Sequence, residues 1–187
     1  MVTTEIKPIN TEYKGYKFRS RLEARWAVFF DSIGTSWEYE TEGYEFADGT
    51  RYLPDFSLSS KEIGTYFIEI KPNHAKVEEI HKASQLAKNF ETVVMIMVGD
   101  PYESFMNSVK QSASISIDQY GHILPVEGFF FLVCAGLITP LKYIDLVNQA
   151  RKDGDLKKCF EVVKDEIAKC FTGVKKARAA RFEFGEA

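Results

Sequence analysis

Asp55, Glu69 and Lys71 are the residues whose types and positions suggest chemistry. Asp55 interrupts the apolar run 52–58, and Glu69 and Lys71 interrupt the run 65–72. Burying an ion without a partner costs several kcal/mol, so charged side chains in such runs need a partner. A divalent cation shared by the two carboxylates would provide one, and oxygen ligands of this kind are those that Mg²⁺ prefers.

The spacing of these residues predicts that they lie close together. The two apolar runs have the pattern of strands, and the polar, glycine-containing segment 59–64 between them has the length of a hairpin connection. Glu69 and Lys71 are two positions apart, so on a strand their side chains leave the same face. A hairpin therefore predicts that Asp55 lies alongside this pair.

Proline-aspartate followed, after a hairpin, by Glu-x-Lys resembles the motif of the PD-(D/E)XK nuclease superfamily. The matching residues are Pro54, Asp55, Glu69, Ile70 and Lys71. Residues 18–27 are similar to the first helix of phage and bacterial members, whose acidic residue also serves the site, and Glu23 is that residue here. The resemblance covers residues 13–98, about half the chain.

The resemblance implies a Mg²⁺-dependent deoxyribonuclease, an endonuclease encoded by a phage or a bacterium, in which Mn²⁺ substitutes for Mg²⁺. Asp55, Glu69 and the backbone carbonyl of Ile70 would bind the ion. Lys71 would orient or activate the attacking water, or stabilise the phosphate. Glu23 would bind a second ion or a water on the metal, or would orient Lys71.

Each of these residues also has an ordinary structural explanation. Ser20 and Glu23 form a capping box, in which the two side chains satisfy free backbone donors at a helix start. Glu69 and Lys71 fit a solvent-facing strand, and Asp55 fits a turn after proline. The sequence does not separate the capping role of Glu23 from a role in the site.

Further candidate residues lie outside the motif. The candidate DNA contacts near the chain start are Lys17, Arg19, Arg21 and Arg25. A second group of basic residues, at 175–181, is a weaker candidate for DNA contact, because runs of charged residues most often lie on the solvated surface. Gln85 is a possible accessory residue, since several family members carry a site-facing polar residue on the corresponding helix, although the tyrosine expected four positions later is Asn89 here. His74 and His81 are expected to be exposed polar residues.

The elements that must position these residues follow from periodicity. The predicted elements, in order, are a strand within 13–18 after a poorly structured lead-in, a helix over 20–32, strands over 37–40, 44–46, 52–58 and 65–72, a helix over 75–89 and a strand over 92–98. Gly34 is expected to cap the first helix, and Asp48–Gly49 has the composition of a hairpin turn. This order predicts an α/β fold, a mixed central sheet flanked by helices, which the resemblance makes restriction-endonuclease-like.

We expect a single domain over 1–187, with the nuclease core at 13–98 and a family-specific extension at 99–187. The extension is predicted to contain a helix at 101–110, strands at 115–117, 122–124 and 129–133, and mostly helix from about residue 140. Its three cysteines, Cys134, Cys159 and Cys170, lack a metal-binding spacing and are expected to be core thiols.

The composition indicates a packed protein: 187 residues, 45% hydrophobic and 14% aromatic. We expect a cytoplasmic protein without a membrane partner, within a bacterial host cell if a phage encodes it, because the sequence has neither a signal-peptide pattern nor an apolar run of membrane-spanning length. The formal net charge of −3 does not by itself indicate DNA binding. A nuclease, however, carries its own acidic cluster and binds phosphate through local patches.

Two other functions remain open. One is a catalytically silent nuclease-fold module that binds DNA or protein, such as an anti-defence protein or a recombination accessory factor. The intact Asp55, Glu69 and Lys71 argue against it. The other is a structural protein whose acidic residues lie on the surface. If the protein is a nuclease, a homodimer would let two sites cut both strands of its DNA partner.

Overall fold

The computed structural model describes residues 9–60, 64–107, 115–125, 152 and 164–182. The strand predicted at 129–133, the helical residues predicted at 140–163 and the residues Cys134 and Cys159 lie outside the described residues, apart from Lys152. None of the helices in the described ranges is long and apolar enough to cross a membrane.

The described chain contains both helices and strands. In order they are β1 (Thr11–Tyr13), β2 (Tyr16–Phe18), α1 (Arg21–Ile33), β3 (Trp37–Tyr39), β4 (Tyr44–Glu45), β5 (Arg51–Tyr52), β6 (Phe56–Ser60), β7 (Gly64–Lys71), α2 (Val77–Asn89), β8 (Val94–Val98), α3 (Pro101–Asn107), β9 (Ile115–Ile117), β10 (Ile123–Pro125) and α7 (Lys164–Ala179).

The centre of the fold is a mixed sheet with the strand order β10-β9-β8-β7-β6-β3. Only β7 and β8 pair in parallel in this sheet, among the described residues, and α2 forms the crossover between them. Strand β8 is buried as predicted for 92–98, because it has a neighbour on each side and helices over both faces. The mixed α/β fold predicted from the sequence is confirmed.

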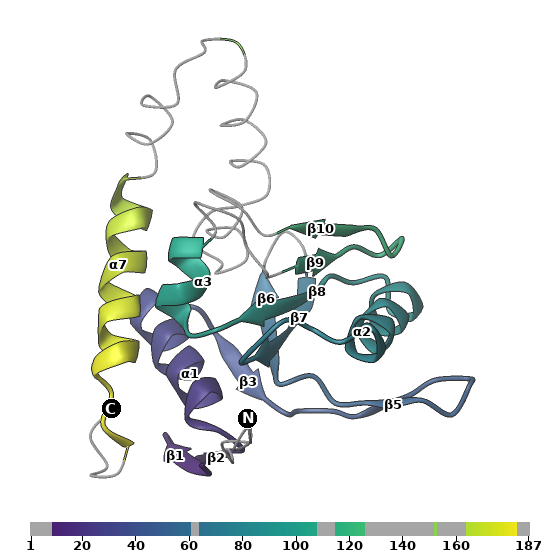
Figure 1. The fold of residues 1–187 in the computed structure, drawn as a ribbon, viewed down its shortest axis with the longest axis horizontal. Coiled ribbons are helices and arrows are strands. Elements are labelled where there is room, and N and C mark those ends of the chain that lie inside the picture. Colours follow the sequence, from purple (N-terminus) through teal and green to yellow (C-terminus); the bar gives the residue numbers. More distant parts are fainter. Residues whose placement is uncertain (1–8, 61–63, 108–114, 126–151, 153–163, 183–187) are drawn as a thin grey trace, which may run out of the picture.

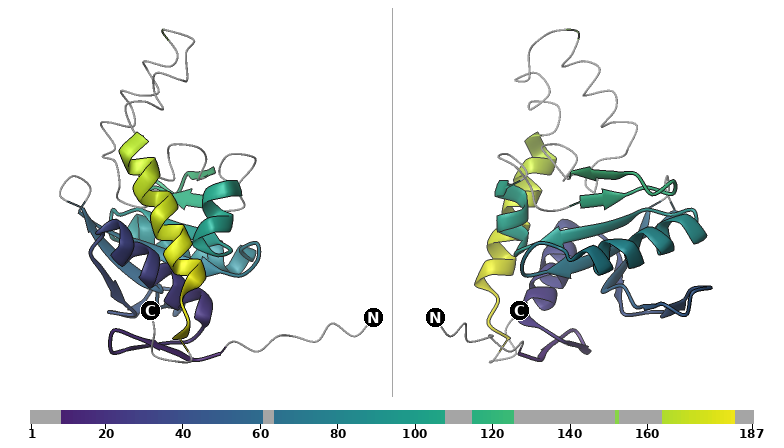
Figure 2. Two further views of the ribbon diagram at one scale, coloured as in Figure 1. Left: turned by 90° about the vertical axis from the view of Figure 1, so that its left-hand side faces the viewer. Right: turned by 45° about the vertical axis from the view of Figure 1, so that its right-hand side comes forward.

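Helices cover the sheet on two sides, with α1, α3 and α7 on one and α2 on the other (Figures 1 and 2). The side chains of β7 alternate between these sides. Tyr66, Ile68 and Ile70 belong to the core beneath α1, and Phe67 belongs to the core beneath α2. Glu69 and Lys71 are two and four positions after Phe67, so their side chains leave the same face of the sheet, the one covered by α2.

Helix α1 has the boundaries that the sequence predicts. Ser20 is its N-cap, and Gly34 ends it in the left-handed conformation at φ 78°. Its buried stripe includes Trp26, Phe29 and Phe30.

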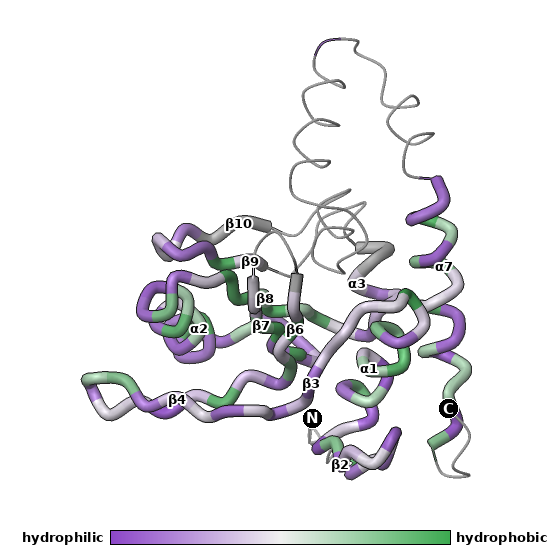
Figure 3. The backbone as a smooth tube through the Cα atoms, turned by 180° about the vertical axis from the view of Figure 1, so that it is seen from behind, coloured by the Kyte–Doolittle hydropathy of each residue, from purple (hydrophilic) through white to green (hydrophobic). Residues whose placement is uncertain are grey.

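The C-terminal helix α7 packs against α1 and α3, the two other helices on its side. It alternates hydrophilic and hydrophobic residues in Figure 3, as a helix with one packed face does. The approach to α1 is close, since a Cβ added at Gly173 would lie 2.9 Å from the side chains of both Phe29 and Ile33. Cys170 on the same face is a buried free thiol, as expected. Residues of the predicted extension thus complete the packing of the first helix.

Two predictions about strands are wrong. Residues 11–18 form the antiparallel hairpin β1–β2, with its turn at Lys14 and Gly15, instead of a lead-in followed by one strand. The segment 52–58 is split, because Tyr52 ends β5, which pairs with β4, and β6 begins only at Phe56. Pro54 has no N–H to donate to a ladder, so the break falls around it.

Candidate active site

Asp55 and Glu69 lie side by side because β6 and β7 form the predicted hairpin. The antiparallel register pairs Phe56 with Ile68, so one further step sets Asp55 opposite Glu69. The Ile70 N–H donates a 2.7 Å hydrogen bond to Asp55 Oδ2 across the same strands. Both carboxylates are buried, with Asp55 2% and Glu69 7% exposed. Two acidic side chains thus share one buried location.

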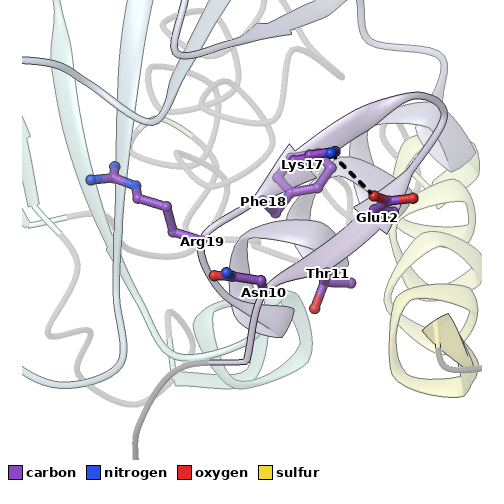
Figure 4. Close-up of a pocket in the computed structure, with 6 residues that line it drawn as sticks. All are labelled: Asn10, Thr11, Glu12, Lys17, Phe18 and Arg19. Atoms are coloured by element: carbon purple, nitrogen blue, oxygen red, sulfur yellow. Dashed lines mark ion pairs between the residues drawn. The ribbon is translucent and has the colours of Figure 1, made fainter.

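Arg19 is the ionic partner of Asp55. Its Nη2 donates to Asp55 Oδ1 at 2.7 Å and lies 2.6 Å from Glu40 Oε1. Arg19 follows directly after β2, and Figure 4 shows its side chain pointing away from the Lys17–Glu12 ion pair of the β1–β2 hairpin. Arg19, one of the four candidate DNA contacts, therefore forms ion pairs with Asp55 and Glu40 in this structure.

Lys71 is the ionic partner of Glu69. Its Nζ lies 2.7 Å from Glu69 Oε1 and 2.9 Å from Glu79 Oε1. The other oxygen of Glu69 accepts from the Tyr52 hydroxyl at 3.3 Å. Glu79 belongs to the first turn of α2, where its second oxygen accepts from the Lys76 N–H at 2.7 Å. The helix that crosses over between β7 and β8 thus adds a carboxylate to the site.

Glu23 takes part in the N-terminal cap of α1, where its N–H donates to the Ser20 hydroxyl at 3.2 Å. The Ser20 hydroxyl donates to its Oε1, and the Arg19 N–H and the Tyr39 hydroxyl donate to its Oε2. It is buried, and its negative charge contributes to the raised pKa of Asp55. The Glu23 carboxylate therefore holds the segment just before α1, through the Arg19 N–H, and acts electrostatically on the candidate site.

The buried carboxylates shift the pKa values around them. Burial raises the pKa of Asp55, and the charges of Glu69 and Glu23 raise it further, to about 8. The Ile70 N–H and the Arg19 charge oppose this rise but are outweighed. Burial by itself would lower the pKa of Lys71, yet the carboxylates of Glu69 and Glu79 raise it above its ordinary value. Lys71 is consequently a cation at neutral pH.

The donor set suits a hard divalent cation. Asp55 and Glu69 supply buried carboxylate oxygens that repel one another, as the raised pKa of Asp55 indicates, and a cation between them relieves that repulsion. No group of three His, Cys, Asp or Glu side chains within the described ranges is arranged to hold a metal ion. A Mg²⁺ ion here would take its remaining ligands from a backbone carbonyl, water and substrate, because Mg²⁺ usually binds through one or two carboxylates and keeps several waters.

The other predicted residues are spread over different surroundings. Gln85 is not part of the cluster, because its amide donates to Asp48 Oδ2 at 2.8 Å, in the turn between β4 and β5. Lys17 is exposed and pairs with Glu12 at 3.8 Å, whereas the Nε of Arg25 is buried. Arg21 is partly exposed at the start of α1. His74 and His81 are exposed, as expected.

A cavity of about 390 Å³ adjoins the site through Arg19 (Figure 4). It is lined by Asn10, Thr11, Glu12, Lys17, Phe18 and Arg19. Arg19 is therefore both a wall of this cavity and the partner of Asp55.

Four residues of the site are not identified by the sequence motif. They are Tyr39, Glu40, Tyr52 and Glu79. Glu79 looks like an ordinary acidic residue in a first helical turn, and Glu40 and Tyr39 look like the end of an edge strand. Tyr52, three residues before Asp55, has a visible signal in its proximity to the motif. The other three come from elements that only the packed fold brings to the hairpin.

Comparison with known proteins does not add a family. No protein-family model matches this chain, and no curated protein sequence matches it. The function is therefore inferred from the contacts, burial and charges of the residues described above.

Proposed function

We propose that this protein is a divalent-metal-dependent nuclease that hydrolyses phosphodiester bonds in DNA, with the restriction-endonuclease-like fold of the PD-(D/E)XK superfamily. The observation that carries the proposal is the β6–β7 hairpin. It sets the buried carboxylates of Asp55 and Glu69 side by side, and Lys71 lies on β7 with Glu69. Cytoplasmic DNA is the proposed partner, and a pair of subunits is the proposed way to cut both strands.

In this proposal Asp55, Glu69 and the Ile70 carbonyl hold Mg²⁺ or Mn²⁺. The bound ion would supply charge stabilisation at the phosphate and a more acidic water. The Ile70 N–H and the Tyr52 hydroxyl each hold one carboxylate in place, at 2.7 Å from Asp55 Oδ2 and 3.3 Å from Glu69 Oε2. Such contacts limit the reorganisation of the ligands when the substrate arrives.

Lys71 acts as a donor. Its pKa is raised by Glu69 and Glu79 against the effect of burial, so its ammonium keeps its proton at neutral pH and cannot accept one from water. It can donate hydrogen bonds to the attacking water or to a phosphate oxygen as negative charge develops there. Of the roles that the motif leaves open, orientation of the water and stabilisation of the phosphate are the ones we retain.

A nuclease-fold binding module without turnover is the second candidate. It is favoured by one observation, namely that all four oxygens of Asp55 and Glu69 contact protein donors or cations. A cluster whose oxygens are all contacted in this way is complete without a metal ion. Such a module would bind DNA or protein but would leave the DNA intact.

The test is cleavage of supercoiled plasmid and of linear single- and double-stranded DNA with Mg²⁺, Mn²⁺ or EDTA. Wild type is compared with Asp55→Asn and Lys71→Met, and with Asp118→Asn as a matched control in the β9–β10 turn, where Asp118 accepts from nearby backbone N–H groups. We expect metal-dependent cutting by the wild type and the control and its loss in the two site variants. DNA left intact by the wild type with both metals, together with no Mn²⁺ binding in calorimetry, would reject the nuclease.

A further inference from the structure

Each buried carboxylate of the candidate site is bound to a cation that also contacts a second, more exposed carboxylate. Asp55, with a side chain 3% exposed, lies 2.7 Å from Arg19 Nη2, and that atom lies 2.6 Å from Glu40 Oε1, whose side chain is 24% exposed. The order of contacts is buried carboxylate, cation, and a more exposed carboxylate that we term the outer one; the Arg19 side chain is itself 58% exposed.

The same order recurs at Glu69. Its side chain is 9% exposed and lies 2.7 Å from Lys71 Nζ, which is 2.9 Å from Glu79 Oε1, with the Glu79 side chain 28% exposed. The two cations come from different elements, Arg19 from the segment after β2 and Lys71 from the end of β7. The two outer carboxylates also come from different parts of the chain, Glu40 from the segment directly after β3 and Glu79 from α2.

The backbone holds Glu40 in its outer position. Its N–H donates to the Asp55 carbonyl at 2.9 Å, and its φ of 45° lies in the left-handed region, which residues other than glycine seldom adopt. Strained backbone of this kind persists where the surrounding structure imposes it and is frequent at functional sites. Glu79 is held as well, by the Lys76 N–H at the start of α2. Neither outer carboxylate is a freely moving surface group.

These contacts have a consequence for metal binding. A divalent cation between Asp55 and Glu69 would compete with Arg19 and Lys71 for the same carboxylate oxygens, and it would repel both positive side chains. Each displaced side chain already touches an outer carboxylate, so it can leave the inner one with only a small movement and without losing its counter-charge.

We infer that Arg19 and Lys71 are exchangeable counter-ions of the metal site, and that Glu40 and Glu79 receive them when a divalent cation takes Asp55 and Glu69. This inference rests on the proposed function. In the metal-free protein the cations contact the inner carboxyl groups. In the metal-bound protein they stay beside the site, where their positive charges face the incoming phosphate. Glu40 and Glu79 are positioning residues in this scheme, since they act through the cations.

The test is the affinity of the full chain for Mn²⁺, measured by titration calorimetry without DNA and at a pH well above 8, so that Asp55 is ionised before the metal binds. Arg19→Gln removes a competing cation and should tighten Mn²⁺ binding by about fivefold, whereas Glu40→Gln removes the receiving group and should weaken it by about fivefold. In the double variant Arg19→Gln/Glu40→Gln, the loss of Glu40 should change the affinity by less than about twofold, because no arginine is left to receive.

The matched control is Arg51→Gln. Arg51 is an exposed arginine one residue from Tyr52, and it pairs with Glu45 at 2.9 Å. Its loss changes the net charge as Arg19→Gln does, so a general effect of charge would appear in both variants. Lys71→Gln and Glu79→Gln form a second set with the same expected pattern, and this set carries the test if Arg19→Gln does not fold.

The outcomes separate the two proposals. If the wild type binds Mn²⁺ but Arg19→Gln weakens binding, Arg19 positions Asp55 for the metal and the exchange is wrong, while the nuclease proposal stands. Equal effects of Glu40→Gln with and without Arg19 would show that Glu40 contributes only its charge and would also overturn the inference. If the wild type binds no Mn²⁺, the inference fails together with the proposed function.

Discussion

The Ile70 N–H donates a 2.7 Å hydrogen bond to Asp55 Oδ2. This bond joins the aspartate before β6 to the central residue of the Glu-x-Lys segment on β7. One neighbour of Ile70 is Glu69 and the other is Lys71. The backbone of a single strand therefore positions the first carboxylate, while the two flanking side chains supply the second carboxylate and the cation.

Divalent metal should stabilise the folded protein through Asp55 and Glu69. At about one hundred times its Kd, Mn²⁺ should raise the free energy of unfolding by about 2.7 kcal/mol, because it binds only the folded state. Asp55→Asn and Glu69→Gln should lose most of this gain, and Asp118→Asn should keep it. Urea denaturation with Mn²⁺ and with EDTA measures the difference. An equal gain in all four proteins would place the metal elsewhere.

The metal-free protein should lose stability as the pH rises from about 4 to about 8. The pKa of Asp55 is about 8 in the folded protein and 3.8 as an ordinary aspartate, so in this window the folded state holds a proton that the unfolded state has released. The stability is therefore fully present below the lower pKa and is lost as the pH approaches the upper one, by at most about 1.4 kcal/mol per pH unit. Urea denaturation in EDTA across this range measures the slope, which Asp55→Asn should flatten. Parallel curves for the two proteins would contradict the raised pKa.

Mn²⁺ binding should release a proton and should strengthen as the pH rises toward 8. The reason is the same raised pKa of Asp55, since a carboxylate must lose its proton before it can bind a metal. Calorimetry in two buffers with different ionisation enthalpies counts the released protons. Glu23→Gln keeps both Asp55 and Glu69 but removes one of the neighbouring charges that raise the pKa of Asp55, so its proton release at neutral pH should be smaller. A proton count of zero in the wild type would refute the prediction.

Lys71→Arg should retain more activity than Lys71→Met. A cationic donor can be partly replaced by another cation, whereas a proton acceptor cannot be replaced by arginine. We expect Lys71→Met to lower kcat by roughly 10²–10³-fold, the usual cost of losing one donor to developing charge. Mn²⁺ affinity measured on both variants separates an effect on binding from an effect on rate. Equal activity of the two variants would show that the positive charge is not what the site requires.

Gly173→Ala should destabilise the protein by about 1–3 kcal/mol, the usual cost of overpacking. The added Cβ would lie 2.9 Å from Phe29 and Ile33 of α1. In an isolated helix the same change would stabilise by about 1 kcal/mol, so the sign of the effect reports the contact between helices. Thr172→Ala, at an exposed position of α7, is the control and should change the free energy of unfolding little. A stabilised Gly173→Ala would show that α7 is not packed closely on α1.

The sequence by itself determined the features that depend on neighbouring residues. The hairpin that sets Asp55 opposite Glu69 follows from period-two strands around a short polar segment, and the ends of α1 follow from the capping chemistry of Ser20 and Gly34. The mixed sheet flanked by helices follows from the order of the elements. The contact between Ser20 and Glu23 at the start of α1 is local too, and the sequence indicates it.

Only the tertiary structure decided which groups surround the two carboxylates. Arg19, Glu40, Tyr52 and Glu79 come from four separate segments, and no sequence spacing relates them, because their distances depend on how the layers pack. The split of 52–58 also depends on long-range packing. Tyr52 pairs with β4 and its hydroxyl donates to Glu69, whereas β6 begins only after Pro54. Local periodicity therefore predicts the hairpin, and long-range packing supplies the charges that would govern its chemistry.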